Sequence, residues 1–416
     1  MSATINLTSR IEGQLPAEMV GFLKAAGESA EKRQARLYLV GGVVRDLLLG
    51  RGNLDLDLVV EGDAISLAQE MAQLKKGKTI THPRFGTAKV RWKNRSADLA
   101  TARAETYARP GALPSVKPGS IKDDLARRDL TINAMAVELG ERFGELLDPY
   151  GGRKDLGRRL IRVLHENSFT DDATRIWRAL RYEQRLDFNL EPDTEKWLRR
   201  DIARLDTISG DRIRHELELV LREELPEKAL HRADELGVLK RLHPSLRGDD
   251  WLAGKFACAR ETVLPDTSLA WLYLVLLAYR LTEEEAEKFI AYLRLPKAAA
   301  LPLRDTLAIK AKIGGLSVPG LAPSRIYDLL HSSTTLALTA NAIAADSATA
   351  AEHIQLHLNA LRYVKTALTG GDLIKMGVPQ GPRMKEILQA LREARLDGKI
   401  GSRKEEKAMV RRLLSG

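Results

Sequence analysis

The sequence predicts an α+β chain in which a mixed sheet with helices is followed by an all-helical remainder. Over the first 140 residues or so, short apolar runs alternate with Gly-marked turns, a pattern typical of strands joined by helices. After Leu156, apolar residues recur at intervals of three and four and turn signals become rare, which indicates amphipathic helices. A length of 416 residues leaves room for about two to four domains.

Individual elements follow from the same patterns. Residues 37–40 form a short apolar strand that Gly41-Gly42 closes, and a helix is expected over 43–49. Residues 54–60 alternate between apolar and acidic side chains, which predicts a strand with one polar face. Further strands are expected over 87–92 and 97–100, and helices over 171–186, 211–222, 226–236, 269–279, 283–293 and 335–351.

The composition excludes several classes of protein. A content of 44% hydrophobic and 29% charged residues excludes a disordered or low-complexity chain. The longest apolar run, 269–279, is too short for a membrane span of about 20 residues, and Arg10 and Glu12 stand where a signal peptide needs its apolar core. Cys258 is the only cysteine, so intramolecular disulfides and multi-cysteine zinc sites are excluded. We therefore expect a cytoplasmic protein.

The charge balance favours an anionic partner. The chain carries 66 Lys and Arg against 56 Asp and Glu, a formal net charge of +10. Residues 371–416 contain 11 of these cations and 6 acidic residues, so half of the surplus lies in this last segment. A basic protein suits nucleic acid, although charge alone does not establish such a partner.

Asp55-Leu-Asp57 is the first candidate for chemistry. Residues i and i+2 of a strand project from the same face, so the two carboxylates should repel each other unless a cation lies between them. Mg²⁺ prefers oxygen ligands, and two such ions about 3.5–4 Å apart can assist phosphoryl transfer. Gly41-Gly42, at a strand-to-helix turn, would let backbone N–H groups approach a triphosphate. An ordinary strand with two exposed aspartates is the alternative.

Arg127, Arg128 and Asp129 form a second candidate cluster. They precede an apolar segment, where the arginines could meet phosphates and Asp129 could accept a hydrogen bond from a ribose hydroxyl. A solvated charge cluster explains the same pattern equally simply.

Asp171, Asp172 and Arg175 form a third cluster, at a predicted helix start with Thr170 as its N-cap. The helical spacing allows Arg175 to meet either carboxylate. A capped helix start with one salt bridge also explains this segment.

Six segments of the sequence, in this order, together resemble the motifs of a known protein family. They are Leu39-Val-Gly-Gly-Val-Val-Arg-Asp46, Asp55-Leu-Asp57, Arg127-Arg-Asp129 with Thr131-Ile-Asn-Ala134, Asp148-Pro-Tyr-Gly-Gly152, Asp171-Asp-Ala-Thr-Arg175 with Arg178-Ala-Leu-Arg181, and Arg212-Ile-Arg-His-Glu216. The set resembles the class II tRNA nucleotidyltransferases, which are the CCA-adding enzymes and their bacterial poly(A) polymerase relatives. The resemblance runs from about residue 36 to 245 and resumes after residue 370.

The resemblance implies a polymerase-beta-like nucleotidyltransferase head followed by a helical neck, body and tail. The expected domains are a catalytic head over 1–150, a neck with the nucleotide-templating helix over 151–225, a body over 226–320 and a tRNA-binding tail over 321–416. The basic residues of 371–416 are the expected RNA contacts.

The resemblance also implies roles for single residues. Asp55 and Asp57 would be the catalytic, metal-binding carboxylates for two Mg²⁺ ions, with Asp98 as a candidate third ligand or a structural strand residue. The nucleotide would be bound by Gly41, Gly42, Arg45, Arg128, Asp129, Asp171, Asp172, Arg175 and Arg178. Among these, Asp171, Asp172 and Arg175 match the trio that reads the base of CTP or ATP. Asp171-Asp172-Ala173 departs from the family's usual Glu-Asp-Pro, so the Asp171 carboxylate reaches one methylene less far.

The implied reaction is CCA addition or repair at the 3′ end of tRNA, with CTP and ATP as substrates and the acceptor stem as a contact. In the family, the switch from C to A addition depends on a loop that is shortened in CC-adding enzymes. Here residues 104–126 give a loop of near-full length, so CC-only addition is less expected, while A-only addition stays open. Poly(A) polymerase, and a non-catalytic tRNA-binding protein on a degenerate head, are the remaining alternatives.

Overall fold

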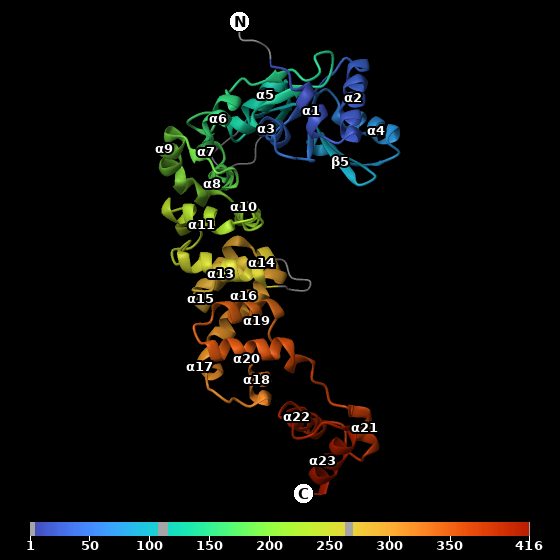
Figure 1. Ribbon diagram of the computed structural model, residues 1–416, viewed down its shortest axis with the longest axis vertical. Helices are drawn as coiled ribbons and strands as arrows, with labels where there is room; N and C mark the ends of the chain where they lie inside the picture. The colour runs from blue at the N-terminus through green and yellow to red at the C-terminus, as the bar shows by residue number, and fades with distance from the viewer. Residues whose placement is uncertain (1–4, 107–114, 263–268, 416) are drawn as a thin grey trace. The chain divides into compact units, whose positions relative to one another are not determined.

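The computed structural model describes residues 5–106, 115–262 and 269–415 (Figure 1). The chain divides into two compact units. Unit 1 contains residues 1–220 and 235–241, and unit 2 contains residues 221–234 and 242–416. All residues with an expected role in catalysis or nucleotide binding belong to unit 1. Among the described helices, none combines the length and apolar character that crossing a membrane requires.

Unit 1 is built on a seven-stranded mixed sheet with the strand order β3-β4-β5-β2-β1-β8-β9. Strands β2 and β5 run parallel, and the other neighbouring pairs are antiparallel. The predicted mixed sheet is thereby confirmed. Its strands are β1 (Arg36–Val40), β2 (Leu56–Glu61), β3 (Lys78–His82), β4 (Thr87–Trp92), β5 (Arg95–Thr101), β8 (Ala136–Glu138) and β9 (Leu146–Leu147); β6 (Arg103–Thr106) and β7 (Ser115–Pro118) form a separate hairpin.

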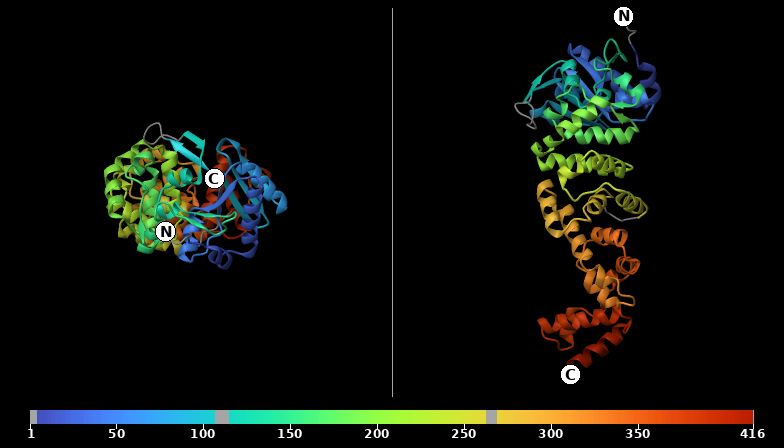
Figure 2. Two further views of the ribbon diagram at one scale, coloured as in Figure 1. Left: turned by 90° about the horizontal axis from the view of Figure 1, so that it is seen from above. Right: turned by 90° about the vertical axis from the view of Figure 1, so that its left-hand side faces the viewer.

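Two helices cover one face of this sheet. α2 (Ala17–Lys32) and α4 (Ala64–Leu74) lie side by side against the strands (Figures 1 and 2). The ring of Phe22 in α2 stacks on Trp92 of β4 at a centroid distance of 4.3 Å, and both side chains are buried. Side chains alternate along a strand, so Lys89 and Arg91, three residues and one residue before Trp92, point to the opposite face.

Helices complete unit 1 around and after the sheet. They are α1 (Thr8–Gln14), α3 (Gly42–Leu49), α5 (Ile121–Ala126), α6 (Gly152–Arg158), α7 (Ser168–Asp171), α8 (Thr174–Leu186), α9 (Pro192–Asp201), α10 (Gly210–Leu221) and α12 (Leu239–Leu242). The short strands β10 (Leu160–Ile161) and β11 (Asn189–Leu190) pair in parallel near α8.

Unit 2 contains helices and no strand within the residues that the structure describes, as the sequence predicts (Figure 2). The helices are α11 (Pro226–Glu235), α13 (Asp250–Glu261), α14 (Leu269–Leu277), α15 (Glu283–Leu293), α16 (Lys297–Lys310), α17 (Ile313–Leu316), α18 (Pro323–Leu330), α19 (Thr335–Ala344), α20 (Ala348–Asn359), α21 (Gly370–Lys375), α22 (Pro382–Leu396) and α23 (Arg403–Ser415).

Two predicted helices are in fact divided. The helix expected over 335–351 ends at Ala344, and Ser347 starts α20 by accepting a hydrogen bond from the Ala350 N–H. The helix expected over 171–186 breaks at Asp172, whose backbone is extended. Its carboxylate accepts hydrogen bonds from the N–H and the hydroxyl of Thr174, so Asp172, and not Thr170, supports the helix start.

Strand β2 differs from the expected strand over 54–60 in two ways. It begins at Leu56, so the exposed Asp55 precedes it, and within β2 only Asp57 is exposed. Val59, two residues further, is buried in an apolar cluster with Val40 and Leu125. The alternation fails there because β2 is an interior strand that α5 covers.

Candidate active site

The turn between β1 and α3 brings backbone close to two charged side chains. Gly41 has a φ of +75°, a conformation that side-chain-bearing residues rarely adopt. A Cβ atom at Gly41 would lie 3.0 Å from Nη1 of Arg128 and 3.7 Å from Oδ2 of Asp57. The positive φ therefore favours glycine here, a Cβ would also crowd the Arg128 guanidinium, and the start of α3 adjoins a carboxylate and a guanidinium.

Asp57 and Asp98 are direct neighbours on the parallel strands β2 and β5. The wall of the site removes part of the hydration of Asp57, although solvent still reaches its carboxylate, and this loss raises its pKa. Arg128 lowers the pKa, Asp98 and Asp55 raise it, and the balance brings it to about 6. Lys89 forms an ion pair of 2.9 Å with Asp98. The structure thus pairs Asp57 with Asp98 within the sheet, with Asp55 outside the strand.

A buried carboxylate fixes the two arginines of the second cluster. Asp124 is fully buried in α5, and its Oδ1 accepts hydrogen bonds from Arg127 while its Oδ2 accepts from Arg128 at 3.0 Å. Arg128 also donates to the carbonyl of Asn133 at 3.4 Å. Both guanidinium groups are therefore held in place before any ligand binds.

Asp129 is buried and engaged by Arg178. Nε and Nη2 of Arg178 lie 2.8 and 2.7 Å from Oδ2 of Asp129, while Oδ1 accepts from the Leu130 N–H and from Asn133. Burial opposes ionisation of Asp129, but the charge and hydrogen bonds of Arg178 outweigh it and lower its pKa below the ordinary value. Glu216 lies 3.9 Å from Arg178, and its buried Oε2 has no hydrogen-bond partner among the residues that the structure describes. Burial raises the pKa of Glu216, against the opposing charge of Arg178.

Asp172 and Arg175 are held separately and do not pair with each other as the spacing predicted. Oδ2 of Asp172 accepts from Arg212 at 2.7 Å, and its Oδ1 accepts from Thr174. Arg175 donates to the carbonyl oxygens of Arg127 at 2.8 Å and Ser168 at 3.4 Å. The reason is the break before α8, which turns Asp172 toward α10 and away from the Arg175 guanidinium.

One cavity of about 450 Å³ brings most of the predicted nucleotide-binding residues together. Asp98 lines an adjacent cavity of about 490 Å³ that also includes Asp57. Asp55, Asp171 and Arg45 do not line either one. The predicted residues around the 450 Å³ cavity are Gly41, Gly42, Asp57, Arg128, Asp129, Asp172, Arg175 and Arg178.

Three predicted residues have other surroundings. Arg45 is buried, and its guanidinium binds Asp46 and the side chain of Asn133 at 2.8 Å, behind the turn that contains Gly41. Asp171 lies at the end of α7, 3.8 Å from Nε2 of His165. The N–H of Asp55 donates to Asn53 in the loop before β2. The specificity loop expected over 104–126 falls partly outside the described residues, since positions 107–114 are not among them.

Sequence reasoning missed several residues at this site. Asp124 could have been found, because it stands three and four residues before Arg127 and Arg128 in a helical segment. No local signal marks Tyr182, whose ring packs against the Arg45 guanidinium at 5.0 Å. Arg127 of the second predicted cluster also lines the 450 Å³ cavity, and the further lining residues are Asn133, Thr174, Tyr182, Arg212 and Glu216.

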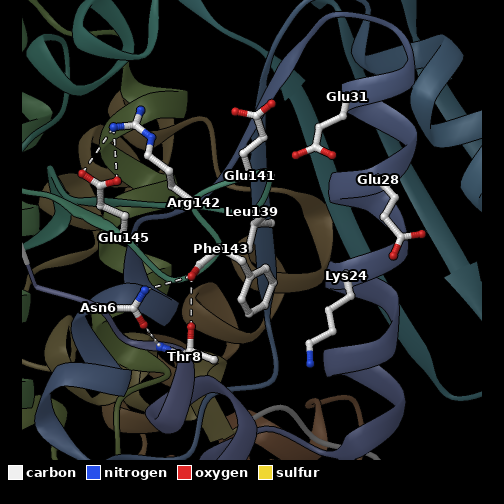
Figure 3. A pocket seen from close by; sticks show the side chains of 11 residues that line it. Asn6, Thr8, Lys24, Glu28, Glu31, Leu139, Glu141, Arg142, Phe143 and Glu145 are labelled. Carbon is white, nitrogen blue, oxygen red and sulfur yellow. Dashed lines mark hydrogen bonds and ion pairs between the residues drawn. The ribbon is translucent and has the colours of Figure 1, made fainter.

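A larger cavity, of about 710 Å³, lies elsewhere in unit 1 and has the wrong charge for a triphosphate. Figure 3 shows Glu28 and Glu31 of α2 facing Glu141 of the turn after β8, with Phe143 between this turn and Lys24. Arg142, the other cation of the cavity, is paired with Glu145 at 3.2 Å. Four glutamates would repel a polyphosphate, so size does not identify the nucleotide site.

Comparisons with known proteins agree with a nucleotide site in the 450 Å³ cavity. The family model described as "Poly A polymerase head domain" matches residues 37–162, and "Probable RNA and SrmB-binding site of polymerase A" matches residues 187–249. The Thermotoga maritima CCA-adding enzyme complexed with tRNA_CCA is 29% identical and covers the full length of both chains with a TM-score of 0.78.

The curated relatives include A-adding and CC-adding enzymes. An A-adding tRNA nucleotidyltransferase of Geobacter sulfurreducens is 35% identical over 96% of this chain and 47% of its own length. Two more A-adding relatives are 37% and 42% identical, and the chain spans about half the length of these three proteins. The CC-adding enzyme of Deinococcus radiodurans is 31% identical over 91% of this chain and 89% of its own length. On this likeness and on the residues gathered around the cavity, the chain belongs to the class II tRNA nucleotidyltransferase family.

Proposed function

We propose that the chain is a template-independent RNA nucleotidyltransferase that adds C and A residues to the 3′ end of tRNA from CTP and ATP. The observation that carries the proposal is the single cavity around which Gly41, Asp57, Arg128, Asp172 and Arg175 converge. Each of these residue types suits one part of a nucleoside triphosphate. We further propose that the protein acts in the cytoplasm and that the basic segment 371–416 contacts tRNA.

The turn at Gly41-Gly42 and the guanidinium of Arg128 form the proposed triphosphate site. The backbone N–H groups at the start of α3 can donate to phosphate oxygens, and the absence of a Cβ at Gly41 lets the phosphate approach. Arg128 contributes a positive charge that Asp124 holds in position. Arg45 is proposed to act indirectly, because it donates a hydrogen bond to Asn133, a residue of the cavity lining, and does not line the cavity itself.

The carboxylates fit a hard divalent cation that is shared with the substrate. No group of three His, Cys, Asp or Glu side chains among the described residues could hold a metal ion by protein ligands alone. Mg²⁺ commonly binds one or two carboxylates and completes its shell with waters and substrate phosphates, and two adjacent carboxylates at Asp57 and Asp98 match that habit. We propose Asp57 as the main ligand, with Asp98 and Asp55 beside it. When bound, two Mg²⁺ ions would supply charge stabilisation at the reacting phosphate.

Asp129 and Arg178 are proposed to bind the ribose. Asp129 already accepts hydrogen bonds from Leu130, Asn133 and Nε of Arg178, and Nη2 of Arg178 forms an ion pair with the same carboxylate, so a ribose hydroxyl would replace one of these partners. Glu216, whose Oε1 lies 3.9 Å from Arg178, also has a buried Oε2, and its carboxylate is proposed to accept the displaced N–H group. The site would thereby distinguish a ribonucleotide from a deoxyribonucleotide, which lacks the 2′-hydroxyl.

Asp172 and Arg175 are proposed to read the base. A guanidinium donates to O2 and N3 of cytosine while a carboxylate accepts from N4, and the same pair can serve the corresponding edge of adenine. Guanine and uracil present the wrong pattern of donors and acceptors. Arg212 and Thr174 hold Asp172, and two backbone carbonyls hold Arg175, so the reading groups are fixed in advance. Asp171 is proposed to act only indirectly.

In the proposed reaction the 3′-hydroxyl of the RNA attacks the α-phosphorus of the bound nucleotide in line. A new P–O bond forms to the RNA, the bond to the β-phosphate oxygen breaks, pyrophosphate leaves, and the hydroxyl proton passes to solvent. The chain contributes positioning and electrostatic stabilisation, with no covalent intermediate.

The test uses three tRNA transcripts that end at the discriminator base, at C and at CC. The protein is incubated with Mg²⁺ and CTP, ATP or both, and the added lengths are read on a sequencing gel. Completion of all three ends to CCA supports the proposal. Long A tracts would indicate poly(A) polymerase, arrest after CC would indicate CC addition, and binding without extension would indicate a non-catalytic tRNA-binding protein.

A-addition is a second candidate because the A-adding relatives are 35–42% identical, against 31% for the CC-adding one. The same transcripts distinguish the two. An A-adding enzyme extends only the transcript that ends in CC, and only with ATP.

A further inference from the structure

The sheet face that carries Asp57 and Asp98 continues beyond them as an open surface. Register pairs Ile80 with Lys89, Lys89 with Asp98, and Asp98 with Asp57, so these four residues form one row across β3, β4, β5 and β2. Residues directly opposite each other in a sheet share a face. The catalytic carboxylates therefore lie at one end of a row that ends in an exposed isoleucine.

The row on one side adds two positive charges to the same face, and the row on the other side adds an imidazole. Lys78 lies opposite Arg91, and His82 lies opposite Thr87. Arg91 and Lys78 are exposed, and Ile80 leaves 42% of its surface accessible. We call Lys78, Ile80, His82, Lys89 and Arg91 the basic sheet face. The helices α2 and α4 pack on the other side of these strands. The stacking of Phe22 in α2 on Trp92 in β4 shows this packing.

A cavity over this face meets the nucleotide cavity at the catalytic carboxylate. Ile80, His82, Lys89 and Arg91 line the cavity of about 490 Å³. It shares Asp57, Arg127 and Arg128 with the cavity of about 450 Å³ that holds the base-reading residues. The two cavities therefore adjoin each other at Asp57.

We propose that the basic sheet face binds the last nucleotides of the acceptor RNA strand, so that the 3′-hydroxyl reaches Asp57 from the side opposite the triphosphate. The inference rests on the proposed nucleotidyl transfer, which requires two substrates at one carboxylate. The glycine turn and the base-reading residues account for one cavity, and the second has the chemistry of an RNA backbone site.

Charge and shape both support this occupant. Lys78, Arg91 and His82 can contact successive phosphates, which at single-stranded RNA lie on the outside of the chain. The exposed side chain of Ile80 offers an apolar surface against which a base or ribose can pack. Lys89 pairs with Asp98, so it links the phosphate-binding part of the face to the carboxylates.

Arg91→Ala and Lys78→Ala test the proposal through steady-state kinetics. We expect each variant to raise the KM for a CC-ended tRNA about tenfold or less, the size expected for one charged contact, while the KM for ATP changes less than about twofold. The dependence of log KM on log salt should weaken by about 0.7 for each lost phosphate contact. Lys32→Ala, which removes a lysine from α2 on the other side of the sheet, is the matched control and should match wild type.

A binding measurement separates this proposal from the proposed function. An acceptor RNA with 4-thiouridine as its penultimate residue is irradiated with the full-length protein in the absence of nucleotide, and crosslinked peptides are identified by mass spectrometry. Crosslinks to residues 78–92 support the proposal even if the wild-type protein extends no RNA. Crosslinks confined to other segments, an unchanged KM for RNA in both variants, or a raised KM for ATP alone would overturn it.

Discussion

Asp57 on β2 and Asp98 on the parallel strand β5 lie directly opposite each other, and the guanidinium of Arg128 and the carboxylate of Asp57 both lie beside the turn at Gly41. Lost hydration is the main reason why the pKa of Asp57 rises to about 6, and repulsion from the neighbouring carboxylate of Asp98 adds to it. Lys89 partly neutralises Asp98 from the strand beyond. The head thus holds an unfavourable pair of charges at the point where a cation and a phosphate are proposed to meet.

Asp98→Asn should lower the pKa of Asp57, because one of the neighbouring negative charges that raise it is removed. In wild type, protonation of Asp57 competes with metal binding below about pH 6. The variant should bind Mn²⁺, used as a probe, more weakly at pH 8, while the pH at which binding is half lost moves downward. Metal titrations between pH 4.5 and 8 measure both quantities. Asp63→Asn, at the N-cap of α4, is the control, and an unchanged midpoint in Asp98→Asn would contradict the argument.

Asp57→Asn should abolish nucleotide addition and yet raise the melting temperature at pH 7.5. Because the pKa of Asp57 is higher in the folded state than its ordinary value of 3.8, the folded state binds a proton more readily than the unfolded state. The free energy of unfolding therefore falls as pH rises from about 4 to 6, and the amide escapes this loss. Thermal melts of variant and wild type at pH 7.5 and pH 4 test the sign: the difference should shrink at pH 4.

The sequence predicted the order of the elements better than the contacts of the site. Periodicity located the strand over 87–92 and the helix over 283–293 within the observed bounds, because both are regular and covered on one side only. It failed at Val59, where an interior strand buries both faces, and at Asp172, where a side chain competes with the helical backbone. It joined α19 to α20 because the three residues between them carry no Gly or Pro.

The contacts between the residues of the site were harder still to predict from the sequence. Spacing paired Arg175 with Asp171 or Asp172, but the partners of Arg175 are the backbone carbonyls of Arg127 and Ser168. The neighbour of Asp57 proved to be Asp98, 41 residues later, as a consequence of the parallel pairing of β2 with β5. Such relations depend on tertiary structure, and no local pattern encodes them.

Asp124→Asn should destabilise unit 1 and weaken nucleotide binding together. The fully buried carboxylate holds Arg127 and Arg128, and its neutralisation removes a negative charge with which both guanidinium groups pair. A loss of about 3 kcal/mol in the free energy of unfolding is expected for breaking such a buried pair. Urea denaturation measures the loss, and the KM for CTP should rise at least about tenfold. Asp123→Asn alters only the exposed capping box of α5, so an equal effect there would contradict the role of Asp124.

Arg212→Lys should reduce discrimination among nucleotides more than it reduces the overall rate. The guanidinium lies 2.7 Å from Oδ2 of Asp172, and the shorter-reaching ammonium of lysine would leave this carboxylate free to turn. Incorporation of UTP relative to CTP should rise about tenfold or more, measured on a transcript that ends at the discriminator base. Arg214→Lys is the matched control, since Arg214 in the same helix pairs with Asp211 and Glu218 outside the cavity. Equal selectivity in both variants would show that Arg212 does not position the base-reading carboxylate.

Gly41→Ala should impair nucleotide binding through backbone strain and through crowding of Arg128. The control variant Gly50→Ala separates these two effects. An alanine at φ +75° is strained by about 1–3 kcal/mol, and its Cβ would press on the guanidinium of Arg128 at 3.0 Å. Gly50, at the other end of α3, also has a positive φ, but nothing lies within 4 Å of a Cβ built there. Both variants should therefore lose stability in urea denaturation, whereas only Gly41→Ala should raise the KM for ATP and CTP. If Gly50→Ala raised these values equally, the strain in α3, and not the space beside Arg128 and Asp57, would control nucleotide binding.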